Sequence, residues 1–420
     1  DGAVPPRRWC IPARVDLKSG YPYWAVKNGL LRAFAPLDRD ARCEVAVLGA
    51  GITGALIADE LVAHGHDVVV ADQRDAAWGS TAASTALLQY EIDTHLVDLA
   101  KRYGERDAVL AYRACSDAID SLASLAKSLR DVEFARARSV YFASRPWHQP
   151  ALREEFAMRQ KHGFRVDWLD RAAVRARYGF ATSAAILSRQ AARVDPYRLA
   201  YKLLARVEKG GGRVHDRTPV VRIDAGARGV RLETEAGACI RAERVVVAAG
   251  YASQRFLRRP VARNRSSYAF VTDPIPAPTL AFLANTMFWE SARPYLYVRA
   301  TGDGRLLVGG EDDAIDLPSR RDASVDAKAA KLARKVARLF PHVPVQPAFA
   351  WGGTFAETSD GLPWFGAHPE TGARTLYAMA YGGNGITYSM LGAGLIRAAI
   401  ERRRHPLARL FGFGRRERSG

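Results

Sequence analysis

The sequence predicts a mixed α/β fold in which a parallel-sheet domain is interleaved with a second domain built on an antiparallel sheet. Two stretches of strand, Gly-rich loop and helix, at residues 44–72 and 349–400, indicate the parallel sheet. Between them, residues 260–320 hold many aromatic residues and alternating strands. At roughly 150 residues per domain, the length allows two or three units. Because no repeat or low-complexity linker separates them, we expect two interleaved domains.

The first elements lead from an irregular segment into a compact strand–helix–strand unit. Residues 1–43 carry many Pro and aromatic residues with little periodicity, and we interpret them as an extended arm on the surface. The apolar run 44–48 predicts a buried strand. Apolar residues recur at helical spacing over 52–62, and Gly65 ends this helix. A second buried strand is predicted at 68–71.

The later elements alternate between helices and strands. A long amphipathic helix is predicted over 108–129, and residues 139–192 alternate short strands and helices. Asp195 and Pro196 form a typical helix start, with Asp as N-cap and Pro in the first turn. An amphipathic helix is predicted over 325–340. Strands are predicted at 230–234, 239–241, 245–247, 268–272, 295–299 and 306–308.

A glycine pattern at the first strand predicts a dinucleotide site. Gly49 permits a tight turn, Gly51 lets the backbone approach a pyrophosphate, and Gly54 lets helix and strand pack closely. The helix N-terminus that follows offers N–H groups and a positive dipole to phosphates. Asp72, 18 residues beyond Gly54, can accept from both hydroxyls of an unphosphorylated ribose. The alternative is a tight turn without a ligand.

Two features bear on which dinucleotide binds. A nicotinamide enzyme would continue strand–helix–strand units into a six-stranded sheet, but a helix-rich segment after Asp72 interrupts that pattern. The run Gly79–Thr85 contains small and hydroxyl-bearing residues, which would let a helix start close to a phosphate and a flat ring. A plain Ser/Thr/Ala-rich loop is the alternative for this run.

Seven motifs follow one another along nearly the whole chain: Val47–Gly54, Gly79–Thr85, Arg193–Pro196, Val245–Gly250, Arg305–Gly310, Ser359–Pro363 and Tyr381–Thr387. In this order they resemble the D-amino acid oxidase superfamily of FAD-dependent oxidoreductases. Within it, the chain is most similar to the glycine/sarcosine oxidase and γ-glutamylputrescine oxidase type. The resemblance implies oxidation of a C–N bond by hydride transfer to flavin N5, giving an imine that hydrolyses.

The resemblance also implies how the domains are divided along the chain. A Rossmann-like FAD-binding domain would be discontinuous and interleaved with an antiparallel-sheet substrate domain. The FAD-binding segments would be 44–95, 193–260 and 350–405, the substrate-binding segments 96–192 and 261–349, the N-terminal arm 1–43 and the basic tail 406–420.

The same resemblance assigns residues to noncovalent FAD. Asp72 would hold the adenosine ribose, Val220 would contact the adenine by its backbone, and 383–387 would lie against the flavin pyrimidine. Because no Cys follows Cys239, no thiol is placed for the covalent link found in the sarcosine oxidase branch. The implied FAD-binding residues are Gly49, Gly51, Ile52, Thr53, Gly54, Asp72, Gln73, Arg74, Ser80, Thr81, Ser84, Thr85, Val220, Ala248, Ala249, Gly250, Gly383, Asn384, Gly385, Ile386 and Thr387.

Substrate contacts are implied from the strands between 266 and 310. Tyr297 and Arg299 share one face of an alternating strand, where the guanidinium could clamp a carboxylate by two hydrogen bonds. A salt bridge on the sheet surface is an equal alternative for Arg299, and packing is the alternative for Tyr297. Tyr381 and Trp289 could form an aromatic wall around an amine, with a core role as the alternative.

Two further sets of residues bear on the substrate and on the electron acceptor. Glu91 and Asp93 follow the Ser/Thr-rich loop and could reach a cationic substrate end, although we favour a structural capping role. In some oxidases of this type a Lys near the flavin assists the reaction with oxygen. Lys328, Lys331 and Lys335 all fall on one predicted helix, so oxygen, a quinone and another carrier all stay open as acceptors.

The net charge and the cysteine pattern indicate which classes of partner and metal site to expect. The formal net charge is +18, from 62 Lys and Arg against 44 Asp and Glu. Because 52 of the basic residues are Arg and are spread along the chain, we favour an Arg-rich surface over a nucleic-acid site. Four Cys without a CxxC pair or His cluster argue against a metal site and fit free thiols in a reducing cytoplasm.

No run of 18 apolar residues is present, and residues 1–20 lack an apolar signal-peptide core, so we expect a cytoplasmic protein with a small-molecule substrate. Peripheral membrane contact and the oligomeric state stay open. Two other functions remain as hypotheses. One is an RNA-modification oxidase. The other is a non-catalytic or electron-transfer flavoprotein subunit that docks a partner through its arm or tail.

Overall fold

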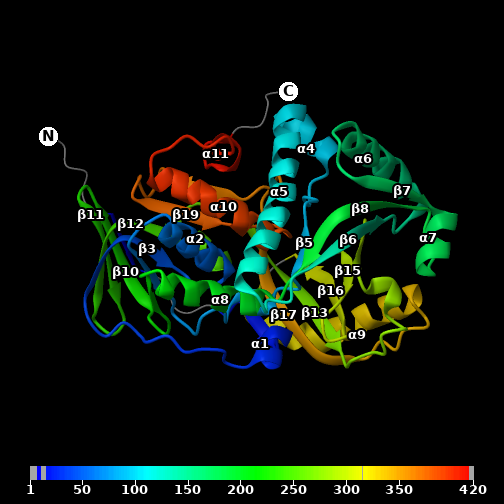
Figure 1. The fold of residues 1–420 in the computed structure, drawn as a ribbon, viewed down its shortest axis with the longest axis horizontal. Coiled ribbons are helices and arrows are strands. Elements are labelled where there is room, and N and C mark those ends of the chain that lie inside the picture. The colour runs from blue at the N-terminus through cyan, green and yellow to red at the C-terminus, as the bar shows by residue number, and fades with distance from the viewer. Residues whose placement is uncertain (1–6, 11–15, 315, 416–420) are drawn as a thin grey trace.

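The computed structural model describes residues 7–10, 16–314 and 316–415, and two large sheets form its body (Figure 1). The strands of the first sheet are β1 (Arg7–Cys10), β3 (Ala41–Leu48), β4 (Val68–Ala71), β9 (Arg213–His215), β10 (Val220–Gly226), β11 (Gly229–Thr234), β12 (Cys239–Val247), β18 (Trp364–Ala367) and β19 (Thr375–Met379). Their order is β1-β10-β11-β12-β3-β4-β9, and β19, flanked by β18, also pairs with β12. The central pairs β12·β3, β3·β4, β4·β9 and β12·β19 are parallel, as the sequence predicts.

The second sheet is mainly antiparallel and has the order β2-β17-β13-β16-β15-β14-β6-β8-β5, with β7 beside β8. Its strands are β2 (Lys18–Gly20), β5 (Leu87–Gln89), β6 (Ala135–Phe142), β7 (Val166–Asp170), β8 (Ala184–Arg193), β13 (Arg263–Thr272), β14 (Thr286–Glu290), β15 (Leu296–Ala300), β16 (Leu306–Asp313) and β17 (Pro347–Glu357). The pair β14·β6 is parallel. The two sheets together confirm the predicted mixed α/β fold.

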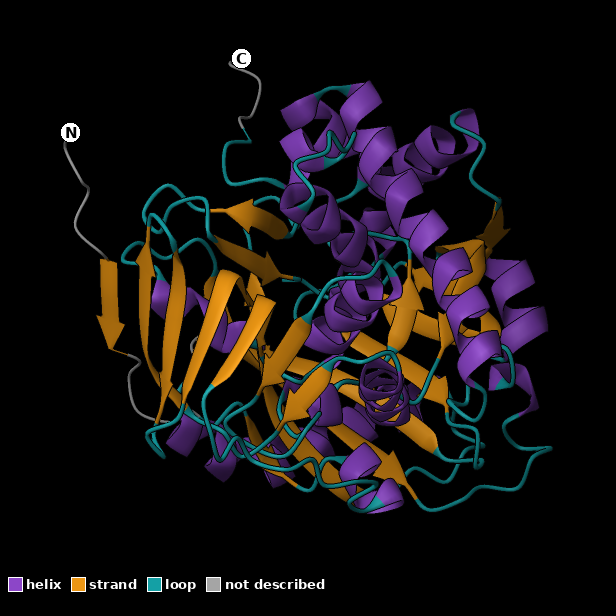
Figure 2. Cartoon of the chain, turned by 60° about the vertical axis from the view of Figure 1, so that its left-hand side comes forward, coloured by secondary structure: helices purple, strands orange, loops and turns teal. Residues whose placement is uncertain are grey.

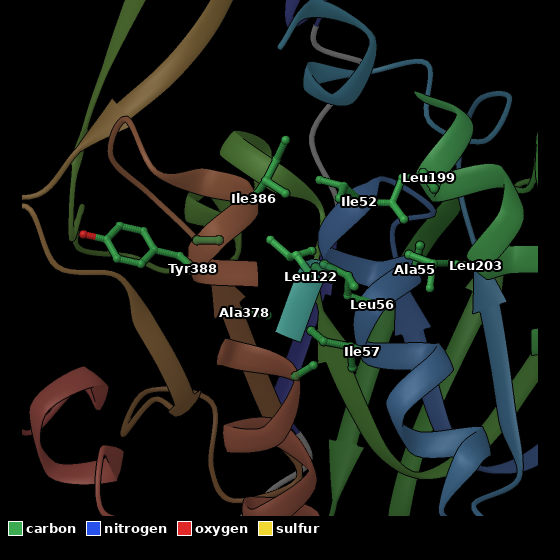
Figure 3. Packing of buried hydrophobic residues seen from close by; sticks show 14 of the residues in the cluster. Ile52, Ala55, Leu56, Ile57, Leu122, Leu199, Leu203, Ala378, Ile386 and Tyr388 are labelled. Atoms are coloured by element: carbon green, nitrogen blue, oxygen red, sulfur yellow. The ribbon is translucent and has the colours of Figure 1, made fainter. Parts of the chain in front are cut away.

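Four helices pack together over the parallel centre of the first sheet. They are α2 (Ile52–Ala63), α5 (Glu105–Leu129), α8 (Pro196–Lys209) and α10 (Gly385–Ile400). Figure 3 shows their contact, where side chains of α2 meet those of the other three helices. Because α2 is apolar on nearly all sides, it is buried nearly all round and not only along one stripe. The N-cap prediction for α8 is confirmed, since the Asp195 carboxylate accepts from the N–H groups of Tyr197 and Arg198.

The remaining helices lie mainly on the second sheet. The long helix α9 (Pro318–Leu339) packs against β17, β13 and β16 and closes a second hydrophobic core. The shorter helices are α1 (Tyr23–Asn28), α3 (Ser80–Ala83), α4 (Leu96–Tyr103), α6 (Gln149–Lys161), α7 (Arg171–Tyr178) and α11 (Ala408–Phe411). Figure 2 shows strands filling the left and lower parts of the view while many helices gather at the upper right. Among the described residues, no helix is both long and apolar enough to cross a membrane.

The structure moves the predicted boundaries between the interleaved domains. β5, expected in the FAD-binding segment 44–95, pairs with β8 of the second sheet. β17 pairs with β13 as far as Glu357, so the return to the first sheet comes later than residue 350. The helix α5, expected in the substrate domain, packs its apolar face against α10 and α8. Strand pairing and helix packing determine which sheet each of these elements joins, and the sequence pattern alone does not show them.

One predicted pair of strands is a single strand in the structure. The strands predicted at 239–241 and 245–247 are both part of β12, which continues through the polar residues Glu243 and Arg244. Its first half pairs antiparallel with β11, and it also pairs in parallel with β3 and β19. The two polar residues lie between the part of β12 that pairs with β11 and the part that pairs with β19, and they do not form a turn.

The arm 1–43 is more than an extended surface segment. Where it is described, it adds β1 to the first sheet and β2 to the second, and α1 buries Tyr23 and Trp24. The indole Nε1 of Trp24 donates to the carbonyl of Ser84 at 2.6 Å. This hydrogen bond joins the arm to the Gly79–Thr85 loop. Burial of the large aromatic side chains of the arm stabilises the contact.

The basic tail 406–420 folds onto the body as far as it is described. α11 buries Leu410 and Phe411. The Arg415 side chain is 3% exposed, with Nε 2.7 Å from Asp360 Oδ2 and its guanidinium 3.3 Å from the centre of the Trp364 ring. The described part of the tail, residues 406–415, is therefore folded onto the body, and docking of a partner through the tail stays a hypothesis. Residues 416–420 lie outside the described part of the chain.

Candidate functional site

A continuous cavity lies where the two sheets meet. Its walls come from the Gly-rich turn after β3, the loop Gly79–Thr85, the start of β10, the end of β12 and the Gly-rich loop before α10. Strands β13, β15, β16 and β17 close the other end. Among the predicted FAD-binding residues, all line this cavity except Gly54 and Thr387.

Two positions around the turn between β3 and α2, Gly49 and Gly54, leave no space for a side chain. Gly49 has a φ of +111°, and a Cβ there would overlap the carbonyl oxygen of Ala248. A Cβ on Gly54 would overlap the carbonyl oxygen of Gly49, so Gly54 sets the close approach of helix and turn. Gly51 lines the cavity at the N-terminus of α2, where a Cβ would lie 3.1 Å from Thr81 Oγ1. The turn thus presents bare backbone to the cavity.

The Ser/Thr-rich loop supplies hydroxyl groups that fit a pyrophosphate. Thr81 Oγ1 accepts from the N–H of Ile52 at 2.9 Å and so joins this loop to the start of α2. Ser80 Oγ is buried, lines the cavity and has no hydrogen-bond partner within the protein. A buried hydroxyl without a partner is costly unless a ligand satisfies it. Together with the bare glycine turn, this unpaired donor matches what a dinucleotide phosphate requires.

Asp72 occupies the place expected for a ribose acceptor. Its two carboxylate oxygens accept from the N–H groups of Ala50 at 2.7 Å and Arg74 at 2.9 Å, which fixes the side chain at the cavity wall. Burial raises the pKa of Asp72 to about 6, against these two N–H groups, which lower it. The carboxylate keeps further lone pairs for the ribose hydroxyls of a bound dinucleotide.

This pKa predicts how the affinity for FAD depends on pH. FAD affinity should be steady above about pH 7 and fall as the pH drops below 6, because a protonated Asp72 accepts poorly. The folded-state pKa lies above the usual 3.8, so Asp72 itself favours the folded apoprotein as pH falls through this window. Fluorescence titration of apoprotein with FAD between pH 5 and 8 measures the effect. An Asp72→Asn variant should bind more weakly and lose this pH dependence; an equal slope in both proteins would contradict the assignment.

The loop before α10 is held by backbone and carboxylate contacts. Gly383 N–H donates to Asp93 Oδ2 at 2.7 Å, and Asn384 Nδ2 donates to the carbonyl of Glu91 at 2.5 Å. Asp93 thus has the capping contact that we favoured. The Glu91 side chain is buried beside Arg159, 3.6 Å away. The first N–H groups of α10 have no partners within the helix and lie at the cavity, which favours a negatively charged group there.

Aromatic side chains form the far wall of the cavity. Tyr297 lines it, with its hydroxyl 3.4 Å from Ser267 Oγ, and burial raises its pKa to about 12. Trp289 also lines the cavity, stacks on Tyr141 and donates to Ser139 Oγ, so it is both core and wall. Tyr381 packs on Tyr251 with ring centres 5.4 Å apart, and its hydroxyl donates to the carbonyl of Gly250.

Arg299 does not line the cavity, which corrects the prediction that it clamps a substrate carboxylate. Its guanidinium donates to the carbonyls of Thr85 at 2.8 Å and Ala300 at 3.1 Å. Burial, together with the nearby Arg193, lowers its pKa to about 9. The alternation along β15 is as predicted, but the strand extends past the cavity, so its last residues support the Thr85 loop from behind. Arg299 therefore holds the end of the Gly79–Thr85 loop at the carbonyl of Thr85.

Tyr251, Ser267 and Asp312 are among the cavity residues that were not sequence candidates. Tyr251 lies in the short 3-10 helix Gly250–Phe256 that follows β12, and Ser267 and Asp312 lie on β13 and β16. Strand alternation on β13 could have indicated Ser267. Asp312 lies in an acidic run that gives no signal for a buried side chain.

Lysine is absent from the described lining of the cavity. Lys328, Lys331 and Lys335 instead contact the acidic end of β16. Lys328 reaches Asp313 at 2.8 Å, and the other two reach Glu311 at 2.6 Å each. These lysines hold α9 on the second sheet, on the side away from the cavity.

Known proteins share both the sequence pattern and the fold. The family model described as FAD-dependent oxidoreductase (DAO) matches residues 44–399. Glycine oxidase of Geobacillus kaustophilus (strain HTA426) is 27% identical over 383 residues, covering 86% of this chain and 94% of the relative. Gamma-glutamylputrescine oxidoreductase of Escherichia coli (strain K12) is 23% identical, covering 89% and 87%. The crystal structure of glycine oxidase from Geobacillus kaustophilus superimposes with a TM-score of 0.76 at 22% identity, covering 90% of this chain and 100% of that one.

Proposed function

The chain belongs to the DAO family of FAD-dependent oxidoreductases, and we propose that it oxidises the C–N bond of a small amine or amino acid. The observation that carries the proposal is the cavity, which joins the glycine turn and the loop before α10 to a wall of aromatic and acidic side chains. The relatives named glycine oxidase and gamma-glutamylputrescine oxidoreductase support the C–N bond as the reacting bond.

In this proposal each part of the cavity binds one part of FAD. The start of α2 and the Ser80 hydroxyl bind the pyrophosphate, and Asp72 binds the adenosine ribose. The first turn of α10, beginning at Gly385, stabilises negative charge on the flavin. The hydrogen bonds from the Gly383 N–H to Asp93 and from the Asn384 side chain to the carbonyl of Glu91 keep that loop in place.

Bound FAD supplies the two-electron acceptor for a hydride. The carbon next to the substrate nitrogen loses its hydrogen as hydride, the nitrogen loses a proton, and a C=N bond forms. Water then adds to the imine, the C–N bond breaks, and a carbonyl compound and an amine or ammonia leave. The chain positions the amine between Tyr297, Trp289 and Tyr381, whose rings exclude water from the reacting carbon.

The purified protein should show the two visible absorption bands of flavin, and acid should release the chromophore. Anaerobic addition of the correct substrate should bleach the bands. We suggest a panel of glycine, sarcosine, proline, D-amino acids, γ-glutamyl amines and simple amines. Bleaching by an amine together with a carbonyl product supports the proposal, and a colourless protein that takes up no FAD refutes it.

The other two hypotheses give different results in the same assay. Flavin that none of these compounds bleaches would favour an electron-transfer or non-catalytic subunit. Salt-dependent binding of tRNA without bleaching by small amines would favour an RNA-modification oxidase. Comparison of dithionite-reduced protein mixed with oxygen or with a quinone then identifies the faster electron acceptor.

A further inference from the structure

The substrate end of the cavity has an acidic wall. Among the described residues that line the cavity, Arg74 and Arg255 are the basic ones, and both belong to FAD-binding segments. The substrate end instead contains Asp93, Asp312 and Glu357. A substrate carboxylate placed there would face like charges, whereas a cation would be attracted.

Asp312 is distinguished from its two acidic neighbours by its direction. On one side of β16, Glu311 and Asp313 face α9, where lysines neutralise both carboxylates. Asp312 lines the cavity on the other side, and its Oδ1 is buried without a hydrogen-bond partner. A buried carboxylate oxygen without a partner is expensive, and a bound cation would satisfy it.

The groups around Asp312 make its charge more costly in the empty cavity. Burial raises the pKa of Asp312 to about 6, helped by the negative charges of Glu357 and Asp93, while the Ser267 hydroxyl and Arg293 lower it. Arg293 is itself occupied, with Nη1 3.4 Å from Glu357 Oε1 and Nη2 donating to the carbonyl of Asp93 at 3.1 Å. The Asp312 carboxylate is therefore an acceptor whose neighbouring cation, Arg293, is already paired with other groups.

Aromatic rings adjoin this carboxylate. Tyr295, Tyr297 and Trp289 line the same part of the cavity, and Gly309 leaves room for the Tyr297 ring, which a Cβ would overlap. Aromatic faces attract ammonium groups and also pack against methylene chains. A methylene chain that ends in an ammonium group would contact the aromatic rings and the Asp312 carboxylate together.

We propose, building on the amine-oxidation function above, that the substrate is a diamine or polyamine whose second, non-reacting ammonium group binds Asp312. The reacting nitrogen has to lose its proton before hydride can leave, and a carboxylate partner would hold that proton in place. A carboxylate is therefore useful at the other nitrogen, where a lasting positive charge anchors the substrate. Asp312 thus selects for a second cation in place of a carboxylate.

The test compares di- and polyamines with a monoamine on the FAD-loaded protein, and putrescine and n-butylamine form the pair with the same four-carbon chain. Dissociation constants for putrescine, cadaverine, spermidine and the monoamine n-butylamine are measured under anaerobic conditions at pH 8 from flavin absorbance. At least one di- or polyamine should bind about tenfold more tightly than n-butylamine, as expected for a hydrogen bond between charged groups. Asp312→Asn should remove that preference. Asp313→Asn, which alters the neighbouring carboxylate facing α9, should retain the preference.

The preference should also disappear below about pH 6, where Asp312 becomes protonated. The charged and titratable groups that face it are Asp93, Arg293, Tyr297 and Glu357, so the pH series is repeated with Asp312→Asn to isolate its part. If no di- or polyamine binds more tightly than n-butylamine, or if Asp312→Asn retains the preference, the inference is wrong. Bleaching by glycine or sarcosine but by no diamine would overturn this inference and leave amine oxidation standing. Diamine binding without bleaching by any amine would support the Asp312 site and overturn the proposed function.

Discussion

Replacement of Gly54 by alanine should abolish FAD binding and lower the free energy of unfolding by about 2–4 kcal/mol. The new Cβ would overlap the carbonyl oxygen of Gly49, so α2 would have to move away from the turn. That movement would displace the N–H groups at the start of α2 and the hydrogen bond between Ile52 and Thr81. Flavin content after purification and thermal unfolding of the apoprotein measure the two effects separately.

A matched glycine-to-alanine change is available in another helix. Gly394 lies within α10, and a Cβ there would meet nothing within 4 Å. Gly394→Ala should keep full FAD content and gain up to about 1 kcal/mol, because alanine is the better helix former. If Gly54→Ala retained FAD as well as Gly394→Ala does, the close approach of α2 to the turn would not be needed for cofactor binding.

The second large effect is expected at the buried carboxylate of Glu155. Glu155 accepts from Arg159 Nε at 2.8 Å and from the N–H groups of Leu96 and Val97 at 3.0 and 3.1 Å. The arginine lowers the pKa of Glu155, although burial alone would raise it. Glu155→Ala should destabilise the protein by about 3–5 kcal/mol, since it removes the hydrogen-bonded partner of a fully buried guanidinium and leaves it only Glu91, 3.6 Å away. The start of α4 would also lose its acceptor.

Chemical unfolding of Glu155→Ala and Glu154→Ala provides the comparison. Glu154 is the preceding residue on α6 and is exposed, so its replacement should change stability by no more than about 0.5 kcal/mol. Glu155→Gln, which keeps an acceptor for Arg159 Nε and for the N–H groups of Leu96 and Val97, should recover part of the loss. Equal stabilities of the two alanine variants would show that the buried pair does not hold α4 and α6 together.

The parts of the fold that the sequence predicts are those governed by local chemistry. The turn at Gly49 requires a positive φ, and the N-cap at Asp195 is a contact between near neighbours. Both are encoded within a few residues and were predicted correctly. Resemblance added the order of the motifs, from which the cofactor and the interleaved domains follow.

The parts that were missed depend on partners far along the chain. The strand prediction ended at Val308, because two glycines and an acidic run are typical of a loop. Pairing with β13 and β15, together with the lysines of α9, extends β16 to Asp313 and turns Asp312 toward the cavity. For Arg299 the face of the strand was predicted correctly, but the cavity ends before Arg299 and is lined by Tyr297 of the same strand. Trp24 and Arg415 gave no periodic signal, since residues far along the chain hold each of them. Trp24 donates to Ser84, and Arg415 contacts Asp360 and Trp364.

Removal of hydride from the carbon next to a substrate nitrogen is the reaction that we propose for this chain. Its most direct test is the anaerobic single-turnover reduction of the FAD-loaded protein by the amine that bleaches it, with deuterium at that carbon. We predict slower bleaching for the deuterated amine and release of one carbonyl product for each flavin reduced. Bleaching at the same rate for both amines, without a carbonyl product, would contradict the account.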